Sequence, residues 1–334
     1  MAAVRSSLQD LVRYQSGNVC ALFNTRKNSP KPLHTKNQSR VITRPQDIRT
    51  FYSDSDSHNK ARSSNAGWMF HQLLGDCMGL VNGPRWKRLR TEFQPDFLRR
   101  SILRTTPNIS KDAKGFVETM VSSDMESLTV RAATAVSGFP FFCTAEYLYG
   151  PLSKTEKELL WAIGQSSLGL MGYVLSGGLF RFGISRVVNR AAIRDLNKFE
   201  AQWADFNHQI YLSRLKESPP PPIVPLWQLV LGSEVATRDV SSPPETLRVS
   251  IPNTPLLQIL HTLSEILFAN LDVSTQALSW LVIFLASDEK IQQELREEIR
   301  CNLDEVEELS NRRNSLLHYS FLETLRLRPF TGKI

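Results

Sequence analysis

Residues 266–276 read Ile-Leu-Phe-Ala-Asn-Leu-Asp-Val-Ser-Thr-Gln and lie inside a longer apolar segment, from Pro255 to about Ser287. Apolar residues fall around most of the circumference of a helix built from that segment, so we expect it to be buried on nearly all sides. Polar residues cost free energy there unless they find partners, and Ser and Thr can draw hydrogen bonds away from the helix backbone. The sequence therefore predicts a long buried helix with a local distortion near its middle.

The segments on either side of this helix are predicted to be mostly helical. Short runs of β-branched and apolar residues predict strands at 19–23 and 40–43. Apolar residues at three- and four-residue intervals predict helices. These are expected at residues 45–52, 84–93, 109–127, 128–149 with a break near 138–140, 191–215, 288–300 and 316–328. The fold class is therefore mainly α with a small N-terminal β region.

The stretch Leu159–Phe180 has no charged residue and is long enough to cross a bilayer. It follows Ser153-Lys-Thr-Glu156, which matches the pattern of a capping box. Its glycines, its serines and Gln165 weigh against a membrane span. We therefore expect two packed or interfacial helical segments with a glycine-rich connection, and peripheral contact with a membrane stays open.

Proline-rich stretches at 218–225 and 241–244 break the helical pattern. We interpret residues 218–255 as a surface connector of polyproline character rather than a folded element. Residues 1–15 have no apolar segment of the kind found in signal peptides and membrane anchors, so we expect an N-terminal tail without an anchor. Residues 16–334 are expected to form a single domain that contains the connector.

The overall composition excludes several classes of protein. The net charge is +7, and the basic residues are scattered rather than gathered in a block, which argues against a nucleic-acid partner. The four cysteines lie far apart and form no Cys-x-x-Cys pair, so neither a zinc site nor a disulfide framework is expected. A reducing compartment is the natural setting for such a chain.

Two pairs of residues are candidates for a functional site. Trp86 and Arg90 fall on one face of the helix expected at 84–93, where an indole N–H and a guanidinium could hold a carboxylate. The alternative is a basic surface helix anchored by one aromatic residue. Glu323 and Arg326 lie one turn apart on an otherwise apolar helix, so we expect a partly buried ion pair. The alternative is an ordinary exposed salt bridge.

The polar residues of the long helix are a third candidate. Asn270 and Ser274 share one face of that helix, and Asp272 and Thr275 share another. A distorted buried helix with a carboxylate and hydroxyl groups could hold water or dioxygen. The alternative, which these residues favour when taken alone, is a hydrogen-bonded contact between two helices.

These features, in this order, resemble the cytochrome P-450 family. That family has a Trp-x-x-x-Arg helix early, an oxygen-activation helix in the middle and a Glu-x-x-Arg helix soon afterwards. The residues at 41–48 and 145–153 resemble further segments of the family, and Phe268-Ala-Asn-Leu-Asp-Val-Ser-Thr275 is most similar to filamentous-fungal members, many of which serve secondary metabolism. The resemblance covers residues 16–330, nearly the whole chain.

The resemblance implies a haem-dependent monooxygenase. Trp86 and Arg90 would bind a haem propionate, while Asp272 with Ser274 or Thr275 would relay protons on the distal side. Glu323 and Arg326 would form a structural pair that braces the proximal fold. The family inserts one oxygen atom from O2 into an apolar small molecule, with electrons from NADPH through a reductase, and works at the endoplasmic reticulum membrane. Without an anchor, the alternative location is the cytoplasm.

The sequence also departs from the family's pattern. Val273 stands where the family has a threonine after the acid, and no Phe-x-x-Gly-x-x-x-Cys-x-Gly loop is present to supply the iron-binding cysteine. We assign none of Cys20, Cys77, Cys143 and Cys301 to iron. The expectation is an incomplete cytochrome P-450 fold, truncated before its metal ligand. The alternatives are a non-catalytic pseudoenzyme or binding protein, and, less favoured, a helical membrane-surface protein unrelated to haem.

Overall fold

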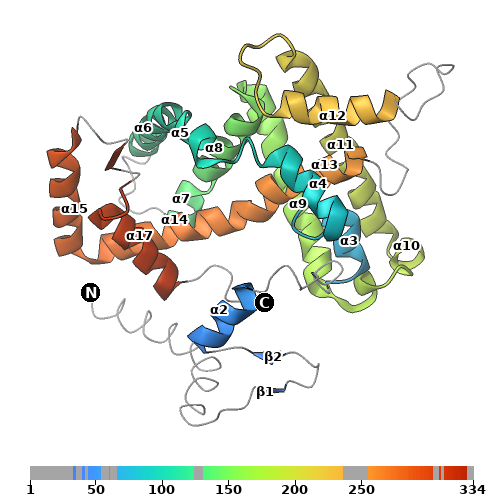
Figure 1. Cartoon of the computed structure of the whole chain (residues 1–334), viewed down its shortest axis with the longest axis horizontal. Coiled ribbons are helices and arrows are strands. Elements are labelled where there is room, and N and C mark those ends of the chain that lie inside the picture. Colours follow the sequence, from blue (N-terminus) through green and yellow to red (C-terminus); the bar gives the residue numbers. More distant parts are fainter. Residues whose placement is uncertain are drawn as a thin grey trace. The chain divides into compact units, whose positions relative to one another are not determined.

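A computed structural model describes residues 33–34, 40–41, 44–53, 60, 66–123, 131–235, 255–303, 308–309 and 312–328 (Figure 1). The chain divides into two units, Met1–Asn59 and Lys60–Ile334. The expected domain instead begins at residue 16, and its extent stays a prediction.

The first unit contains the small β region and one helix. Strands β1 (Leu33–His34) and β2 (Arg40–Val41) pair antiparallel, with Leu33 opposite Val41. Helix α2 (Pro45–Ser53) follows, and Pro45 suits its first position because no backbone N–H is needed there. The strand expected at 40–43 and the helix expected at 45–52 are thus found. The strand expected at 19–23 lies outside the described residues.

The regular elements described in the second unit are all helices. Its helices up to the end of the uncharged stretch are α3 (Trp68–Leu74), α4 (Gly83–Phe93), α5 (Arg99–Leu103), α6 (Thr106–Ser123), α7 (Ala132–Val136), α8 (Gly138–Tyr149) and α9 (Lys154–Ser176). After a 3-10 turn (Gly178–Arg181) come α10 (Ser185–Val188), α11 (Arg190–Arg214), α12 (Ile223–Val235), α13 (Pro255–Ser264), α14 (Asn270–Ser287), α15 (Glu289–Cys301) and α17 (Leu316–Leu327). The mainly α fold class is confirmed, and the break expected near 138–140 lies at Ser137.

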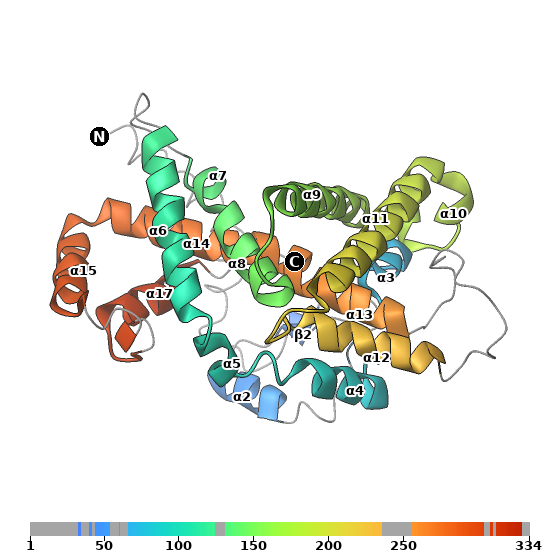
Figure 2. The same cartoon turned by 90° about the horizontal axis from the view of Figure 1, so that it is seen from above.

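The long helix predicted from the apolar segment is present as α13 and α14, which form one 33-residue helix. Figure 2 shows the two in line, with α3 and α12 beside α13 and with α15 and α17 beside α14. A single π-turn, Glu265–Ala269, joins them. The expected distortion is therefore real, and it lies directly before the polar residues that begin at Asn270.

The core of the unit forms where the π-turn meets α9 and α11. Phe268 lies within the turn, and its ring centroid is 4.8 Å from that of Trp203 and 6.1 Å from that of Phe199. The Trp203 indole N–H donates to the carbonyl of Leu260 at 3.0 Å. The apolar stripe on α11 faces the core and is buried: Phe199, Trp203, Phe206 and Ile210.

Helix α9 corrects the expectation of two helical segments between residues 159 and 180. It runs unbroken to Ser176, because its buried side, with Leu160, Ile163 and Leu170, packs against the core despite the internal glycines. The capping box is confirmed, since Ser153 N–H donates to Glu156 Oε2 at 2.6 Å. The glycine-rich connection comes after the helix, where the φ angles of the two residues at 177–178 are +65° and +56°.

Helix α12 corrects part of the expected connector at 218–255. Residues 223–235 are helical, because Ile223, Val224 and Trp227 are buried. Pro225 is tolerated since it lies in the first turn, where backbone N–H groups have no partner within the helix. The rest of the connector from residue 236 to 254 lies outside the described residues.

The segment between α3 and α4 is held against the long helix by hydrogen bonds from its own backbone. The N–H of Asp76 donates to His261 Nδ1 at 3.1 Å, that of Met78 to Thr262 Oγ1 at 3.1 Å, and that of Gly79 to Glu265 Oε2 at 2.9 Å. These side chains accept from a non-helical segment that would otherwise bury unpaired donors. The contact fixes where α4 begins.

Gly79→Ala tests this contact, because an added methyl group would lie 1.7 Å from Glu265 Oε1 and must displace that carboxylate. The Gly79 N–H would lose its acceptor, and we expect the free energy of unfolding to fall by about 1–2 kcal/mol. The matched control is Gly115→Ala on α6, where nothing lies within 4 Å of the new methyl group. The control should gain about 0.5–1 kcal/mol. Urea unfolding measures both, and equal changes in the two variants would contradict the contact.

Candidate functional site

Helix α4 carries the first candidate pair and is clamped to α13 by two arginines. Arg85 pairs with the buried carboxylate of Asp76, which belongs to the segment held by the long helix. One turn further on, Arg88 donates to the side-chain oxygen of Gln258 on α13. Leu89 is buried beneath them. Because these contacts fix the rotation of α4 about its own axis, they also fix the direction of its remaining side chains.

Trp86 and Arg90 lie together on one face of α4, with Trp86 partly buried against the core. The guanidinium carbon of Arg90 is 5.7 Å from the centroid of the Trp86 ring, and the ammonium of Lys60 is 5.6 Å from the same centroid. Arg90 is exposed, and its Nε donates to Gln94 at 3.3 Å. The expected shared face is therefore present. Two cations beside one indole suit an anionic group such as a carboxylate, and the assignment to a haem propionate stays a prediction.

The candidate residues of the long helix have different surroundings. Thr275 is buried and its hydroxyl donates to the carbonyl of Ser137 at 3.4 Å, in the break between α7 and α8. This is the helix–helix contact that the sequence left open as an alternative. Ser274 is half-buried. The side chains of Asn270 and Asp272 lie outside the described residues, so the proposed proton relay stays a prediction.

The Glu323–Arg326 pair is exposed rather than partly buried. Arg326 donates from Nε and Nη2 to the two carboxylate oxygens at 2.7 and 2.5 Å, while 53% of the Glu323 side chain and 67% of the Arg326 side chain are exposed. The hydrogen bonds from Arg326 lower the pKa of Glu323. The correction has a geometric cause, because α17 turns Thr324 inward and leaves the pair on its other side.

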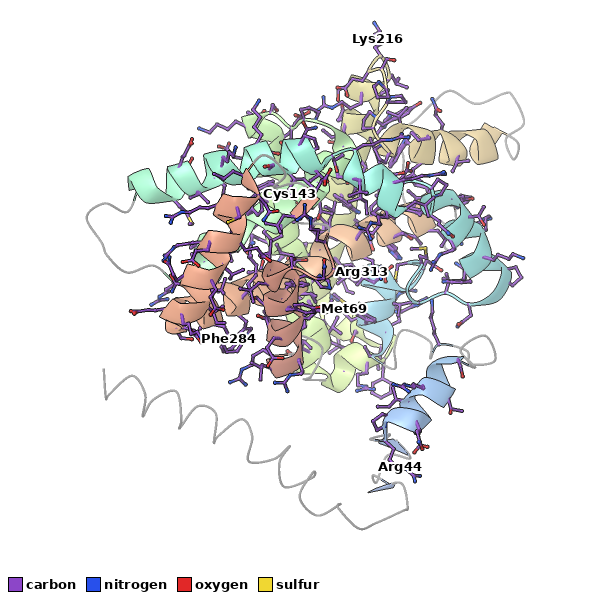
Figure 3. All side chains as sticks on the ribbon, turned by 60° about the vertical axis from the view of Figure 1, so that its left-hand side comes forward. Arg44, Met69, Cys143, Lys216, Phe284 and Arg313 are labelled. Atoms are coloured by element: carbon purple, nitrogen blue, oxygen red, sulfur yellow. The ribbon has the colours of Figure 1, made fainter. Side chains whose placement is uncertain are left out.

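The described cysteines lie in different surroundings. The thiolate is the form that ligates a metal. Burial raises the pKa of the Cys77 thiol, and the neighbouring carboxylate of Glu265 adds to that effect. Burial likewise raises the pKa of Cys143, on α8 and labelled in Figure 3, to about 11. Cys301 is exposed at the end of the charged helix α15. Within the described ranges, no group of three or more His, Cys, Asp or Glu residues is placed to hold a metal.

The polar network that links α4 to the long helix was not predicted from the sequence. Its members on the long helix are spaced at three and four residues, which places them on one face, and a search for polar stripes would have found them: Gln258, His261 and Thr262 on α13 and Glu265 at the start of the π-turn. Their partners Asp76, Met78, Gly79 and Arg88 lie between 170 and 186 residues away in the chain. Pattern alone does not reveal that pairing.

The fold, the Trp86/Arg90 helix, the distorted long helix and the Glu323/Arg326 helix together define a class of protein, and a family comparison identifies it. The family model described as Cytochrome P450 matches residues 33–334. The chain therefore belongs to the cytochrome P-450 family.

Curated relatives from fungi share much of this sequence. The chain is 36% identical over 295 residues to the cytochrome P450 monooxygenase sirC of Leptosphaeria maculans, and 34% identical over 300 residues to the cytochrome P450 monooxygenase hasH of Aspergillus fumigatus. Each alignment covers 86% of this chain but 59% and 51% of those relatives. The chain thus spans little more than half the length of the proteins it matches.

A solved structure shows the same fold at low sequence identity. The crystal structure of CalO2 matches with a TM-score of 0.59 and 14% identity, and the match covers 94% of this chain and 67% of that one. This likeness concerns the fold alone.

His261 provides a test of the polar network by pH. Burial, with a smaller contribution from His71, lowers its pKa from 6.5 to about 4. The unfolded chain therefore takes up a proton on this side chain between pH 6.5 and 4 that the folded chain does not. That difference removes about 3 kcal/mol of stability as the pH falls through this window.

Glu200 on α11 acts in the opposite direction, because burial raises its pKa to about 7. In the folded chain, Glu200 keeps a proton that the unfolded chain releases above pH 4.5. Its contribution to the free energy of unfolding is therefore lost as the pH rises. On acidification, the stability of the His261→Asn variant should rise relative to that of the unmodified protein. The stability of the Glu200→Gln variant should fall relative to it. Urea unfolding from pH 7 to pH 4 measures both, and identical pH profiles in the two variants would disprove these assignments.

Proposed function

We propose that the chain contributes the propionate-binding and distal residues of a haem-dependent monooxygenase that inserts one oxygen atom from O2 into an apolar small molecule. The observation that carries this proposal is the clamp between α4 and α13. It fixes Trp86 and Arg90 on a helix tied to the same long helix that carries Asp272 and Ser274. An anion-binding pair on α4 and a polar break in an apolar helix thus belong to two helices that contact each other.

The described residues fit one part of a haem and not another. Arg90 and Lys60 beside the Trp86 indole match the charge and shape of a propionate. We assign none of the described cysteines to the axial position; burial raises the pKa of Cys77 and of Cys143. A haem with a thiolate ligand supplies oxygen activation in this family. We therefore assign to this chain the binding of the propionate and the supply of protons, and no chemistry at iron.

Within that function, each candidate residue has a proposed role. Asp272 and Ser274 would deliver protons on the distal side, and Thr275 would mainly hold α14 against the break between α7 and α8. Glu323 and Arg326 would stabilise the proximal side, where both side chains are exposed. From membership of this family we further propose a place in fungal secondary metabolism, electrons from NADPH through a reductase, and the endoplasmic reticulum membrane as location.

A second candidate function is a non-catalytic or binding protein of the same family. The protonated state of the buried thiols favours it, together with the exposure of the Glu323–Arg326 pair. The two candidates differ in whether the chain holds haem through a thiolate.

Reconstitution with haem distinguishes the two candidates. We expect the 334-residue chain, reduced and exposed to CO, to lack the Soret band of a thiolate-bound haem, because burial raises the pKa of the Cys77 and Cys143 thiols. Absorbance spectroscopy is the measurement. A thiolate-type band would overturn this expectation and would favour a catalytic chain.

Arg90→Ala tests the propionate assignment in a form of the protein that carries a haem-binding cysteine loop. Loss of a charge-assisted hydrogen bond should weaken haem retention about tenfold. Transfer of haem to an apo-globin acceptor measures the loss without reference to turnover. Arg100→Ala on α5 is the control, since Arg100 is exposed and on another helix. Equal retention in the two variants would remove Arg90 from the site.

A further inference from the structure

A groove lies between helices α8 and α9. Its volume is about 510 Å³, which falls within the range of roughly 300–1,000 Å³ that is typical of small-molecule sites. Its lining combines two aromatic rings, two lysines and one carboxylate with the backbone at the break between α7 and α8. We call it the α8–α9 groove, and it is lined by Ser137, Gly138, Phe142, Leu152, Lys154, Lys157, Glu158 and Trp161.

The two aromatic rings of the groove are held in place by the core. The ring centroids of Phe142 on α8 and Trp161 on α9 are 5.8 Å apart, and the ring planes are tilted by 34°. Both side chains are half-buried, and the buried ring of Phe141 contacts them at centroid distances of 5.2 and 5.4 Å. Because these rings are fixed before any ligand binds, a planar aromatic group can stack on them at little conformational cost.

The charges of the groove favour an anion. Two cations, Lys154 and Lys157, line it together with one carboxylate, that of Glu158. The Lys157 ammonium lies 5.8 Å from the Phe142 ring centroid and forms an ion pair with Glu146 at 2.8 Å. An ammonium group has three donors, so this pair leaves donors for a ligand. Lys154 is 4.0 Å from Glu158, but the two side chains are 90% and 66% exposed, so this ion pair is weak and Lys154 can turn to a ligand.

The groove also reaches the contact between α8 and the long helix. Ser137 lines the groove, and its carbonyl accepts from the Thr275 hydroxyl of α14 at 3.4 Å. None of the residues of the two candidate pairs, on α4 and α17, lines the groove. A ligand in the groove would therefore contact the support of α14 without using either pair.

We propose that the α8–α9 groove binds a small planar aromatic carboxylate, with its ring stacked on Phe142 and Trp161 and its carboxylate at the ammonium groups of Lys154 and Lys157. The rings select a flat apolar group and the lysines select negative charge, so separate parts of the groove recognise the two parts of the ligand. This inference goes beyond the proposed function, because it requires neither haem nor turnover.

Isothermal titration calorimetry of the 334-residue chain with two matched probes tests the proposal. The probes are naphthoate, which carries a carboxylate, and naphthamide, which has the same rings without the charge. We expect naphthoate to bind about fivefold more tightly, because a charge-assisted hydrogen bond in a partly exposed groove adds modestly to stacking. Lys157→Gln should remove most of that difference. Phe142→Leu should weaken the binding of both probes by about fivefold.

Matched controls come from a similar aromatic contact elsewhere in the chain. The ring centroids of Trp280 and Phe284 on α14 are 5.7 Å apart with a tilt of 31°, nearly the geometry of the pair in the groove, and Figure 3 labels Phe284. Phe284→Leu, and Lys290→Gln on α15, should change the affinity for either probe by less than about twofold. Circular dichroism checks that every variant is folded.

Several outcomes would overturn the proposal. They are no binding of naphthoate, equal affinity for the two probes, or unchanged affinities in the groove variants, with Lys154→Gln as a second charge variant if Lys157→Gln does not fold. Loss of binding in Phe284→Leu would place the probe at the other aromatic contact, and loss in Arg90→Ala alone would place it beside Trp86. Loss of haem binding with unchanged naphthoate binding would overturn the proposed function and leave the groove site supported.

Discussion

The backbone donors of the segment between α3 and α4 need acceptors, and the long helix provides them. His261, Thr262 and Glu265 accept three successive contacts from residues 76–79, and Gln258 accepts from Arg88 one turn earlier on the same helix. A buried donor without a partner would cost more than most single packing contacts provide. The position of α4, and with it the direction of Trp86 and Arg90, follows from satisfying those donors.

Much of the fold follows from the sequence because its causes are local. Helix α11 shows its buried stripe at every third or fourth residue, and the capping box at Ser153 and Glu156 marks the start of α9 without any tertiary information. The break between α7 and α8 is likewise visible from the Gly138 and Pro140 that follow it. Helix α12 was missed because burial of Ile223 and Trp227 outweighs the nearby prolines, and burial depends on the rest of the chain.

Some features of the candidate site likewise follow from local sequence, and others depend on tertiary contacts. The pairing of Trp86 with Arg90 is a matter of helical spacing and was predicted. The bond from Thr275 to Ser137 and the pairing of Asp76 with Arg85 depend on which segments meet in space, so spacing alone could not give them. The exposure of Glu323 and Arg326 also depends on tertiary contacts. The sequence indicates that α17 is largely apolar, but not which of its sides other helices cover.

The π-turn at 265–269 has a consequence for how the long helix evolves. Such a turn holds about one more residue than an α-helical turn, so it rotates everything after it by roughly 100° about the helix axis relative to an uninterrupted helix. Glu265 meets residue 79 on one side, and Thr275 meets Ser137 on another. A one-residue deletion in this turn would not shorten any surface segment. It would nevertheless rotate the whole of α14 toward different neighbours. The number of residues in this turn therefore sets the rotation of the helix that follows it. Gaining or losing a single residue there would change which side chains face a ligand.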